Sequence, residues 1–413
     1  MSRLLQIGFI WFGCAIAWVI LGSTLIERSG ESSMALQEEV QALWGPALEL
    51  RPLTGQFTVM TSDVHKTTIR DSTGRDVETT VSKDIPVVHD IRLEGSELHA
   101  KLHLQHRQKG LLWFPTYDVE VDGRYRLRND SDARRAIEFS FPLPGEHAIY
   151  DGFSVLDEQG KVVDVVVQKG NASWTMTLQP DEVRSFTVGL RSRGTSSFGY
   201  ALTGGTGEVR DFSMQIETDF PEVDFPAGSI SPTEHHRAGA GWSGEWKFSR
   251  LIAGMNIALV LPQRINPGPL ASRITFFAPV GLLFFFFVVA VRAAAKGRDM
   301  HPLNYFFFGC AFFAFHLLFA YLVDHLAIAP ALAIASVVSI GLVVSYARLF
   351  VGWRYALVEM GIAQLLYLVL FSTTFLWKGY TGLSITVGAV VTLFVMMQFT
   401  GRRRLVSTVP DHP

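Results

Sequence analysis

The sequence is poor in cysteine and in charge. Only two of its 413 residues are cysteines, Cys14 and Cys310, and both lie inside apolar runs. They therefore exclude a disulfide framework for the polar part of the chain. Charged residues make up 18% of the chain, whereas a soluble domain usually has about 25%. This shortage indicates that part of the chain lies in a membrane.

The missing charge is unevenly distributed along the chain. Residues 27–273 hold 34 of the 38 acidic and 26 of the 36 basic residues, which gives a local net charge of −8. The remaining 166 residues hold only four acids and ten bases. The sequence therefore predicts a polar domain joined to a membrane domain. Because the polar domain is slightly acidic, we expect no nucleic-acid partner.

The sequence also lacks the short motifs of common catalytic and nucleotide-binding sites. It has no G-x-S-x-G, H-E-x-x-H or Walker motif, and the glycine-rich stretch 204–207 lacks the strand–turn–helix context of a phosphate cradle. On a strand, His99 and His103 lie about 13 Å apart on one face and His106 points to the other, so they do not form a zinc site alone. His235-His236 fits a surface loop. We therefore expect no enzymatic activity, metal or cofactor.

Six apolar segments are long enough to cross a bilayer, for which a helix needs about 20 residues. The first, roughly 5–26, exceeds the apolar length of a secretory signal, so a retained anchor is favoured over a cleaved signal. The domains predicted are an anchor at 1–26, a β-rich domain at 27–273, a five-helix bundle at 274–400 and a tail at 401–413. The five later spans are roughly 274–291, 303–323, 327–347, 355–376 and 382–399.

Basic residues in the short loops predict the orientation of these spans. Nine bases flank the spans on one side, and only Lys378 lies on the other. Because positive loops stay in the cytoplasm, we expect cytoplasmic termini and an outward-facing domain at 27–273. A cysteine-free exported domain fits a bacterial periplasm, so we expect a multi-pass inner-membrane protein in contact with the lipid bilayer. The nine bases are Arg3, Arg292, Lys296, Arg298, Arg348, Arg354, Arg402, Arg403 and Arg404.

Short alternating runs in residues 27–273 predict β-structure. The stretch 97–105 alternates apolar and polar residues, as a half-buried strand does. Asp122-Gly123 favours a tight hairpin, and Pro180-Asp181 favours a turn between two further strands. We expect about 8–12 strands in an antiparallel, β-sandwich-like fold. The fold is expected to have two sub-units, 50–195 and 209–262, and to be preceded by a short amphipathic helix within 33–50 that ends at Gly45-Pro46. The fold class is thus an α + β multi-domain membrane protein.

Four ionisable residues in or beside the spans are candidate functional residues, because such groups are costly inside a membrane. His316 lies in the middle of the third span, where packing or an interhelical hydrogen bond is favoured over a proton relay. Glu359 lies near the start of the fifth span, within reach of Arg354. Asp324 and His325 stand where the third span leaves the bilayer and favour interfacial capping.

The third span and its flanks, HPLNYFFFGCAFFAFHLLFAYLVDHLAIAPALAIAS, resemble the CreD family of inner-membrane proteins, also described as colicin-tolerance or envelope-integrity proteins. His301, Pro302 and Tyr305 match the HP-x-x-Y opening of that family, and Asp324-His325 stands where Glu-His is usual. His316 takes a position where an aromatic residue is expected. The resemblance covers about 292–400 and implies a role in envelope homeostasis and stress response, with no assigned catalysis.

Three functions remain open from the sequence. The first is a non-enzymatic, CreD-like envelope-integrity protein whose periplasmic β domain binds envelope components or a periplasmic or inner-membrane protein partner. The second is a secondary transporter that uses the helical bundle, motivated by His316 and Glu359. The third is a membrane-embedded enzyme that acts on lipid or peptidoglycan precursors and needs converging polar side chains. Polar groups that meet at one membrane depth would favour the second or third function.

Overall fold

The computed structural model describes residues 3–70, 76–145, 148–202, 208–252, 254–297, 300–377 and 379–401. The glycine-rich stretch 204–207, Arg298, Lys378 and the predicted tail from residue 402 onward lie outside these residues. The chain divides into two compact units. The helical unit comprises 1–36, 108–113 and 265–413, and the β-rich unit comprises 37–107 and 114–264.

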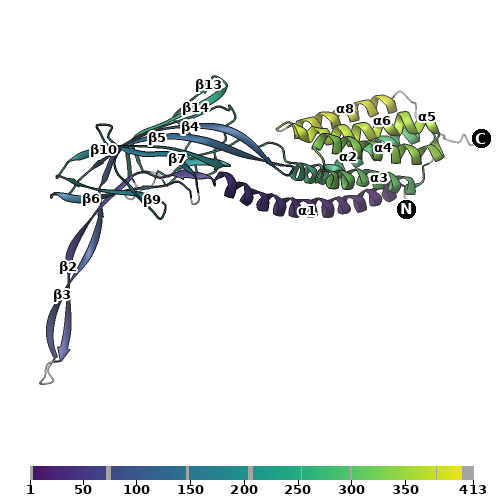
Figure 1. The fold of residues 1–413 in the computed structure, drawn as a ribbon. Helices are drawn as coiled ribbons and strands as arrows, with labels where there is room; N and C mark the ends of the chain where they lie inside the picture. The colour runs from purple at the N-terminus through teal and green to yellow at the C-terminus, as the bar shows by residue number, and fades with distance from the viewer. Residues whose placement is uncertain are drawn as a thin grey trace, which may run out of the picture. The chain divides into compact units, whose positions relative to one another are not determined.

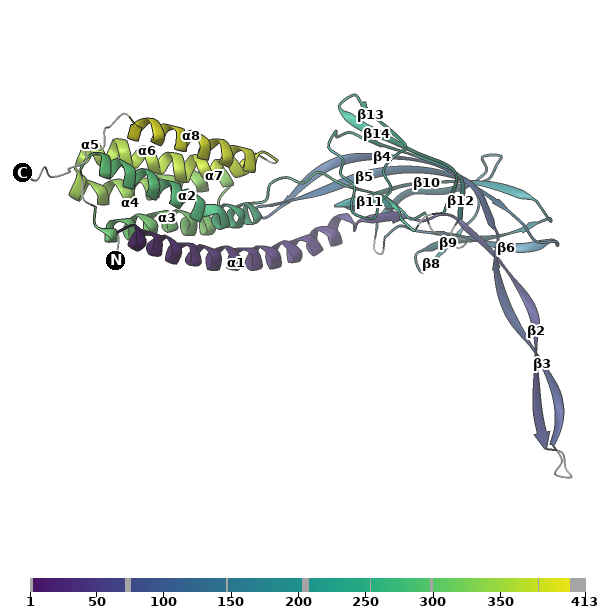
Figure 2. The ribbon, with the colours of Figure 1, turned by 180° about the vertical axis from the view of Figure 1, so that it is seen from behind.

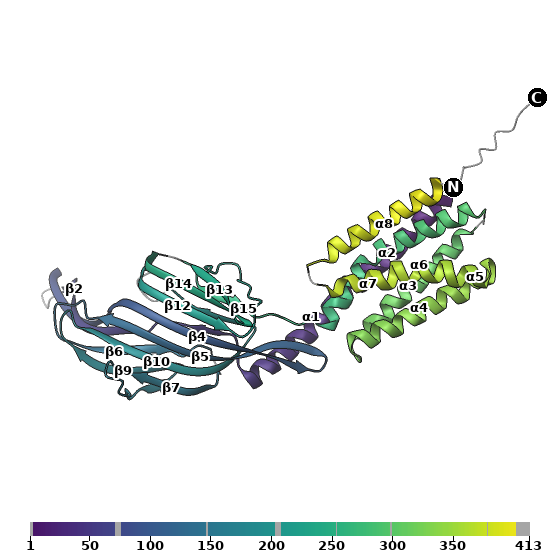
Figure 3. The ribbon, with the colours of Figure 1, turned by 90° about the horizontal axis from the view of Figure 1, so that it is seen from above.

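Among the described residues, six helical segments are long and apolar enough to cross a membrane, which confirms the six predicted spans. Figure 3 shows α2, α3, α4 and α8 running alongside one another in the bundle. The fifth segment, Trp353–Leu376, is not a regular helix: it contains the π-helical stretches η1 (Ala356–Met360) and η2 (Leu365–Leu370) on either side of α6 (Gly361–Gln364). The other segments are α1 (Arg3–Trp44), α2 (Pro267–Ala295), α3 (Pro302–Leu322), α4 (Ile328–Val351) and α8 (Thr381–Gly401).

The first helix is longer than the sequence predicts. We expected a separate short helix within 33–50, but α1 continues without a break from the first span to Trp44. No proline interrupts residues 27–44, and a single glycine is tolerated inside a helix. The helix ends where predicted, because Gly45 has a φ of +126° that few other residues adopt. Residues 48–50 then form strand β1 (Leu48–Leu50).

The described residues of the β-rich unit form three sheets. A seven-stranded sheet has the order β13-β14-β12-β4-β5-β10-β7, a five-stranded sheet has the order β3-β2-β6-β9-β8, and a three-stranded sheet has the order β1-β11-β15. Side chains from all three sheets share one buried core. The strands are β2 (Thr54–Arg70), β3 (Asp76–Asp90), β4 (Arg92–Lys109), β5 (Leu112–Arg128), β6 (Arg135–Pro142), β7 (Tyr150–Leu156), β8 (Val166–Gln168), β9 (Asn171–Leu178), β10 (Val183–Thr195), β11 (Ser197–Tyr200), β12 (Glu208–Thr218), β13 (Glu234–Ala238), β14 (Gly241–Ile252) and β15 (Ile257–Val260).

The topology corrects two predictions about this unit. The sub-units 50–195 and 209–262 are not separate, because β12 lies between β14 and β4 in the seven-stranded sheet. The sheet is also not wholly antiparallel, since β12 pairs with β4 in parallel. Parallel neighbours need a long connection, so short-range turn signals do not reveal this pairing.

The hairpin predicted at Asp122-Gly123 is wrong as well. Strand β5 runs straight through this dipeptide, and Gly123 pairs with Val188 of β10. The alternating residues Val121, Tyr125 and Leu127 are buried, so burial of this face favours an uninterrupted strand. A Cβ on Gly123 would lie 3.0 Å from the ring of Tyr125. The glycine therefore makes room for a buried aromatic ring and does not form a turn.

Two connections between the large sheets meet at one buried side chain. The turn at Pro180-Asp181 joins β9 to β10 as predicted, but these strands belong to different sheets. Asn129, which follows β5, is fully buried. Its Nδ2 donates to the carbonyls of Ala133, Leu178 and Gln179, and its Oδ1 accepts from Ser131. Asn129 thus links the chain leaving β5 with the chain leaving β9.

Candidate functional site

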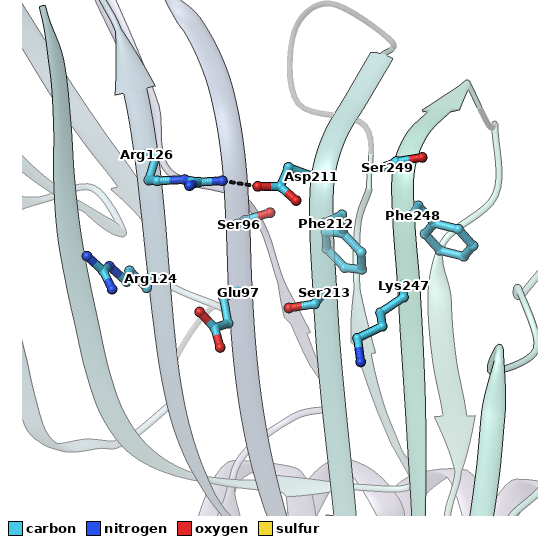
Figure 4. Close-up of a pocket in the computed structure, with 10 residues that line it drawn as sticks. All are labelled: Ser96, Glu97, Arg124, Arg126, Asp211, Phe212, Ser213, Lys247, Phe248 and Ser249. Carbon is cyan, nitrogen blue, oxygen red and sulfur yellow. Dashed lines mark hydrogen bonds and ion pairs between the residues drawn. The ribbon is translucent and has the colours of Figure 1, made fainter.

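A groove of about 540 Å³ lies on the seven-stranded sheet, over strands β4, β5, β12 and β14 (Figure 4). Arg126 points across the groove and forms an ion pair with Asp211. Asp211 has a φ of +39°, a conformation that non-glycine residues rarely adopt. The other side chains in the lining are Ser96, Glu97, Arg124, Phe212, Ser213, Lys247, Phe248 and Ser249.

The groove has the chemistry of a binding surface. Among the described residues, Glu245 holds the Lys247 ammonium at 2.5 Å, and this hydrogen bond raises the pKa of Lys247 above its usual value. Arg124 is exposed and has no ion pair within the described part of the chain. The lining contains three bases and two acids but no histidine or cysteine that would activate its serines. Such a surface can bind a polar ligand with an anionic group.

Two arginines of the groove, Arg124 and Arg126, belong to a longer charge pattern on β5. Alternate residues of the strand carry three acids and then three arginines, all on the face opposite the buried side chains. The acidic half is paired with β10, because Arg193 lies 3.2 Å from Asp118 and Arg191 lies 3.2 Å from Glu120. The pattern D-x-E-x-D-x-R-x-R-x-R from residue 118 is visible in the sequence, but its face was obscured by the wrong hairpin.

The histidines outside the bundle form no metal site among the described residues. His99 and His103 share one face of β4, as predicted, and each faces a carboxylate, Glu217 at 3.6 Å and Asp219 at 3.5 Å. His106 binds the Pro262 carbonyl at 2.9 Å. His235 and His236 lie in the exposed strand β13 and not in a loop, so the prediction of a surface location is right and that of a loop is wrong.

The hairpin formed by β2 and β3 extends beyond the other strands of its unit (Figures 1 and 2). Only residues 54–56 of β2 pair with β6, whereas the ladder with β3 continues from Gln56 to Arg70. At about 3.3 Å per residue this ladder is about 46 Å long. Met60, Val64 and Val88 are 64%, 58% and 56% exposed, and they lie on one face because Thr58 pairs with Val88 and Met60 with Pro86. The hairpin therefore presents apolar side chains that no described residue covers.

The structure places His316 in a dry aromatic environment. Its side chain is 1% exposed, and Nδ1 lies 2.8 Å from the Phe312 carbonyl of its own helix. The rings of Trp18 and Phe315 meet it edge-on, at 5.5 and 4.9 Å between centroids. Because a carbonyl can only accept, Nδ1 carries a proton and donates it to the backbone of its own helix. These contacts favour the packing role, and the interhelical contact is with the ring of Trp18 in α1.

Glu359 lies near the start of the fifth segment but does not meet Arg354. Its carboxylate binds two cations at the end of α2: Arg292 in the last turn, at 2.8 Å, and Lys296, which caps the helix. Its side chain is only 14% exposed. The ring of Phe399 in α8 lies 4.3 Å from the Arg292 guanidinium carbon. Glu359 therefore ties α2 to the π-helical turn η1, and the structure does not bring it together with His316.

Asp324 forms an ion pair with Arg28 of α1, at 2.8 Å. Arg28 lies just beyond the anchor predicted at 1–26, and this ion pair was not expected. The described contacts of His325 include a backbone hydrogen bond to the Leu322 carbonyl at the end of α3. The backbone amide of Asp324 likewise donates to the Tyr321 carbonyl, so both residues lie in the turn that ends α3, and the Asp324 side chain in addition links α3 to α1.

Sequence reasoning missed a polar network in the bundle. The side-chain amide of Gln364 donates to Ser339 Oγ at 2.8 Å, and Ser339 donates to the Ala311 carbonyl at 2.7 Å. Gln364 and Ser339 are fully buried, and each is the twelfth residue of a 24-residue segment. The network therefore lies near mid-depth. By the criterion stated for the three functions, two buried polar side chains that meet at one depth favour the transporter or the membrane enzyme, although the network contains no ionisable group. Gln364 Oε1 has no partner among the described residues, although buried polar atoms are usually paired. Candidate residues in the spans were selected from the sequence by their ionisable side chains, so the uncharged Gln364 and Ser339 were not selected.

The HP-x-x-Y opening has a structural explanation. His301 is the N-cap of α3, where its Nδ1 accepts from the Leu303 amide at 3.2 Å. Pro302 occupies the first helical position, where its missing N–H costs nothing. Tyr305 is 3% exposed and meets the ring of Phe286 edge-on at 5.3 Å. These three residues start α3 and fix it against α2, so the motif has a structural role in this chain.

A family model described as "Inner membrane protein CreD" matches residues 152–405, which is 254 of the 413 residues. No curated protein matches the chain. A solved structure described as "a putative nutrient binding protein" from Legionella pneumophila aligns with 10% identity and a TM-score of 0.33, and the alignment covers 48% of this chain and 71% of that chain. A similarity this low carries no argument about fold or function.

Proposed function

The chain belongs to the CreD family of inner membrane proteins, and from this premise we propose that it maintains cell-envelope integrity by binding a protein partner outside the membrane. In this proposal the β-rich unit lies in the periplasm, both termini are cytoplasmic and the helical unit anchors the chain. The chain binds its partner without catalysing a reaction. The observation that carries the proposal is the exposed apolar face of the β2–β3 hairpin.

A two-stranded ribbon is at best marginally stable in water without a further strand or a packed face. Exposed apolar side chains clustered on such a ribbon mark an interaction surface. Pro86 lies on this ribbon and has no amide N–H, and Asp63 faces Lys83 across the ladder. Proline and charges on an edge strand disfavour strand addition. The partner is therefore expected to cover the Met60–Val88 face and not to extend the sheet.

The test replaces Met60 and Val88 together by aspartate in the full-length protein in cells. Two charges in an apolar interface should weaken partner binding about 100-fold or more. Cells that carry this variant should become as sensitive to envelope-active antibiotics as cells that lack the gene. The measurement is survival under antibiotic challenge, with protein level checked by immunoblotting.

The control is Thr61→Asp, which adds a charge to the opposite face of the same strand. Thr61 is exposed, so the control tests for a general effect of charge on the hairpin. It should leave antibiotic sensitivity unchanged. Equal sensitivity of the two variants, or normal survival of the Met60/Val88 variant, would contradict the proposed docking surface.

A further inference from the structure

Arg28 is fixed at a junction within the helical unit. Its guanidinium forms the ion pair with Asp324 at 2.8 Å, lies 3.4 Å from the Ala320 carbonyl and sits 5.0 Å from the centre of the Tyr321 ring. The side chains of Arg28 and Asp324 nevertheless remain 42% and 44% exposed. A guanidinium has five N–H donors and a carboxylate can accept about four hydrogen bonds. Both groups therefore keep capacity for a ligand.

A cavity of about 300 Å³ opens beside this pair. Its polar lining includes the pair together with Ser29 and Ser32 of α1. Its apolar lining includes Leu25 and Ala271. Helix α2 reaches the cavity because Gly268 has no side chain: a Cβ there would lie 2.2 Å from Ser29 Oγ. The cavity thus has one polar and one apolar side.

The position of the cavity along the helices places it at a membrane surface. Helix α1 has 42 residues and is about 63 Å long, roughly twice the 30 Å hydrocarbon core. Its apolar run, 5–26, ends just before Arg28, and α3 ends at Leu322, two residues before Asp324. Both charges therefore lie where apolar spans end, at the depth of lipid headgroups.

We propose that this cavity binds the headgroup of a zwitterionic phospholipid that carries a primary ammonium, the phosphoethanolamine type. The phosphate would accept from Arg28 and from the hydroxyls of Ser29 and Ser32, because arginine donors match phosphate oxygens well. The ammonium would donate to Asp324. A choline headgroup has no N–H to donate, and a glycerol headgroup has no cation. Each would therefore bind Arg28 through its phosphate but would not donate a charged hydrogen bond to Asp324. The proposal rests on the membrane assignment and not on the hairpin partner.

The test is native mass spectrometry of the full-length protein in detergent with added phosphatidylethanolamine, phosphatidylcholine or phosphatidylglycerol of matched acyl chains. Phosphatidylethanolamine should bind about tenfold more tightly than either other lipid. Asp324→Asn should remove this preference, and Arg28→Gln should weaken the binding of all three lipids. Arg348→Gln, which changes an arginine in the last turn of α4, is the matched control and should change nothing.

A second variant and a competition experiment complete the test. Ser32→Leu fills the cavity without changing the ion pair and should also weaken the binding of phosphatidylethanolamine. This variant tests the site even if Arg28→Gln fails to fold. Soluble phosphoethanolamine should compete at least about 100-fold less well than the lipid; equal competition would identify a soluble ligand and overturn the lipid assignment. Tighter binding of phosphatidylglycerol, or unchanged binding by the Arg28 and Ser32 variants, would overturn the site itself.

Discussion

Replacing Glu359 by alanine is expected to lower the free energy of unfolding of the helical unit by about 3 kcal/mol. The substitution leaves Arg292 and Lys296 without their carboxylate, and their side chains are only 23% and 34% exposed. The pair is partly buried, so the cations left behind keep part of the cost of their lost hydration, and removing the carboxylate is destabilising. The measurement is thermal unfolding of the full-length protein in detergent.

The Glu359 prediction has two controls. Glu31→Ala removes an exposed carboxylate from α1 and should cost less than about 1 kcal/mol. Adding Lys296→Met to Glu359→Ala should recover part of the lost stability, since it removes one of the unpaired cations. If Glu359→Ala and Glu31→Ala unfold at the same temperature, Glu359 does not hold α2 against the fifth segment.

Replacing Asn129 by alanine is expected to destabilise the β-rich unit by about 3 kcal/mol. The change removes the donors to three carbonyl groups and the acceptor for Ser131. Because Asn129 is fully buried, water does not readily replace these bonds, and each unsatisfied buried group costs about 1–3 kcal/mol. Hydrogen exchange in β9 and β10 measures the effect, and their amides should exchange faster in the full-length variant.

Ser131→Ala is the matched control for Asn129. It removes a hydroxyl that donates to Asn129 Oδ1 and to the Ala133 carbonyl, but it leaves the amide of Asn129 in place. Its expected cost is about 1 kcal/mol. Equal exchange rates in the two variants would show that Ser131 or the backbone, and not the side-chain amide of Asn129, links the two connections.

Much of the helical unit could be predicted from the sequence, because a membrane helix is defined by a local property. Long apolar runs gave all six candidate spans, and the start of α3 follows from His301 and Pro302. The partners of the candidate residues were not local. Glu359 binds cations 63 and 67 residues away, and Asp324 binds a cation of the first helix. Sequence position gives the depth of such a group but not the neighbouring helix.

In the β-rich unit, alternation predicted strands but not their neighbours. The stretch 97–105 lies within β4 as expected, yet its parallel partner β12 begins about 100 residues later. The β2–β3 hairpin was missed as a site because its alternation resembles that of a strand inside a sheet. Among the described residues no third strand pairs with the hairpin beyond Gln56, and this leaves Met60 and Val88 exposed. Exposure of this kind depends on tertiary pairing and is not encoded by any short motif.

The most direct test of the account is the side of the membrane on which the β-rich unit lies. Cys14 and Cys310 can be replaced, and single cysteines placed at Gln159, an exposed residue in the turn after β7, and at Arg354, an exposed residue at the start of the fifth segment. In cells with a permeabilised outer membrane, a membrane-impermeant maleimide should label Gln159→Cys. It should label Arg354→Cys only after the inner membrane is broken. Labelling of Arg354→Cys in intact cells, with Gln159→Cys protected, would contradict the account.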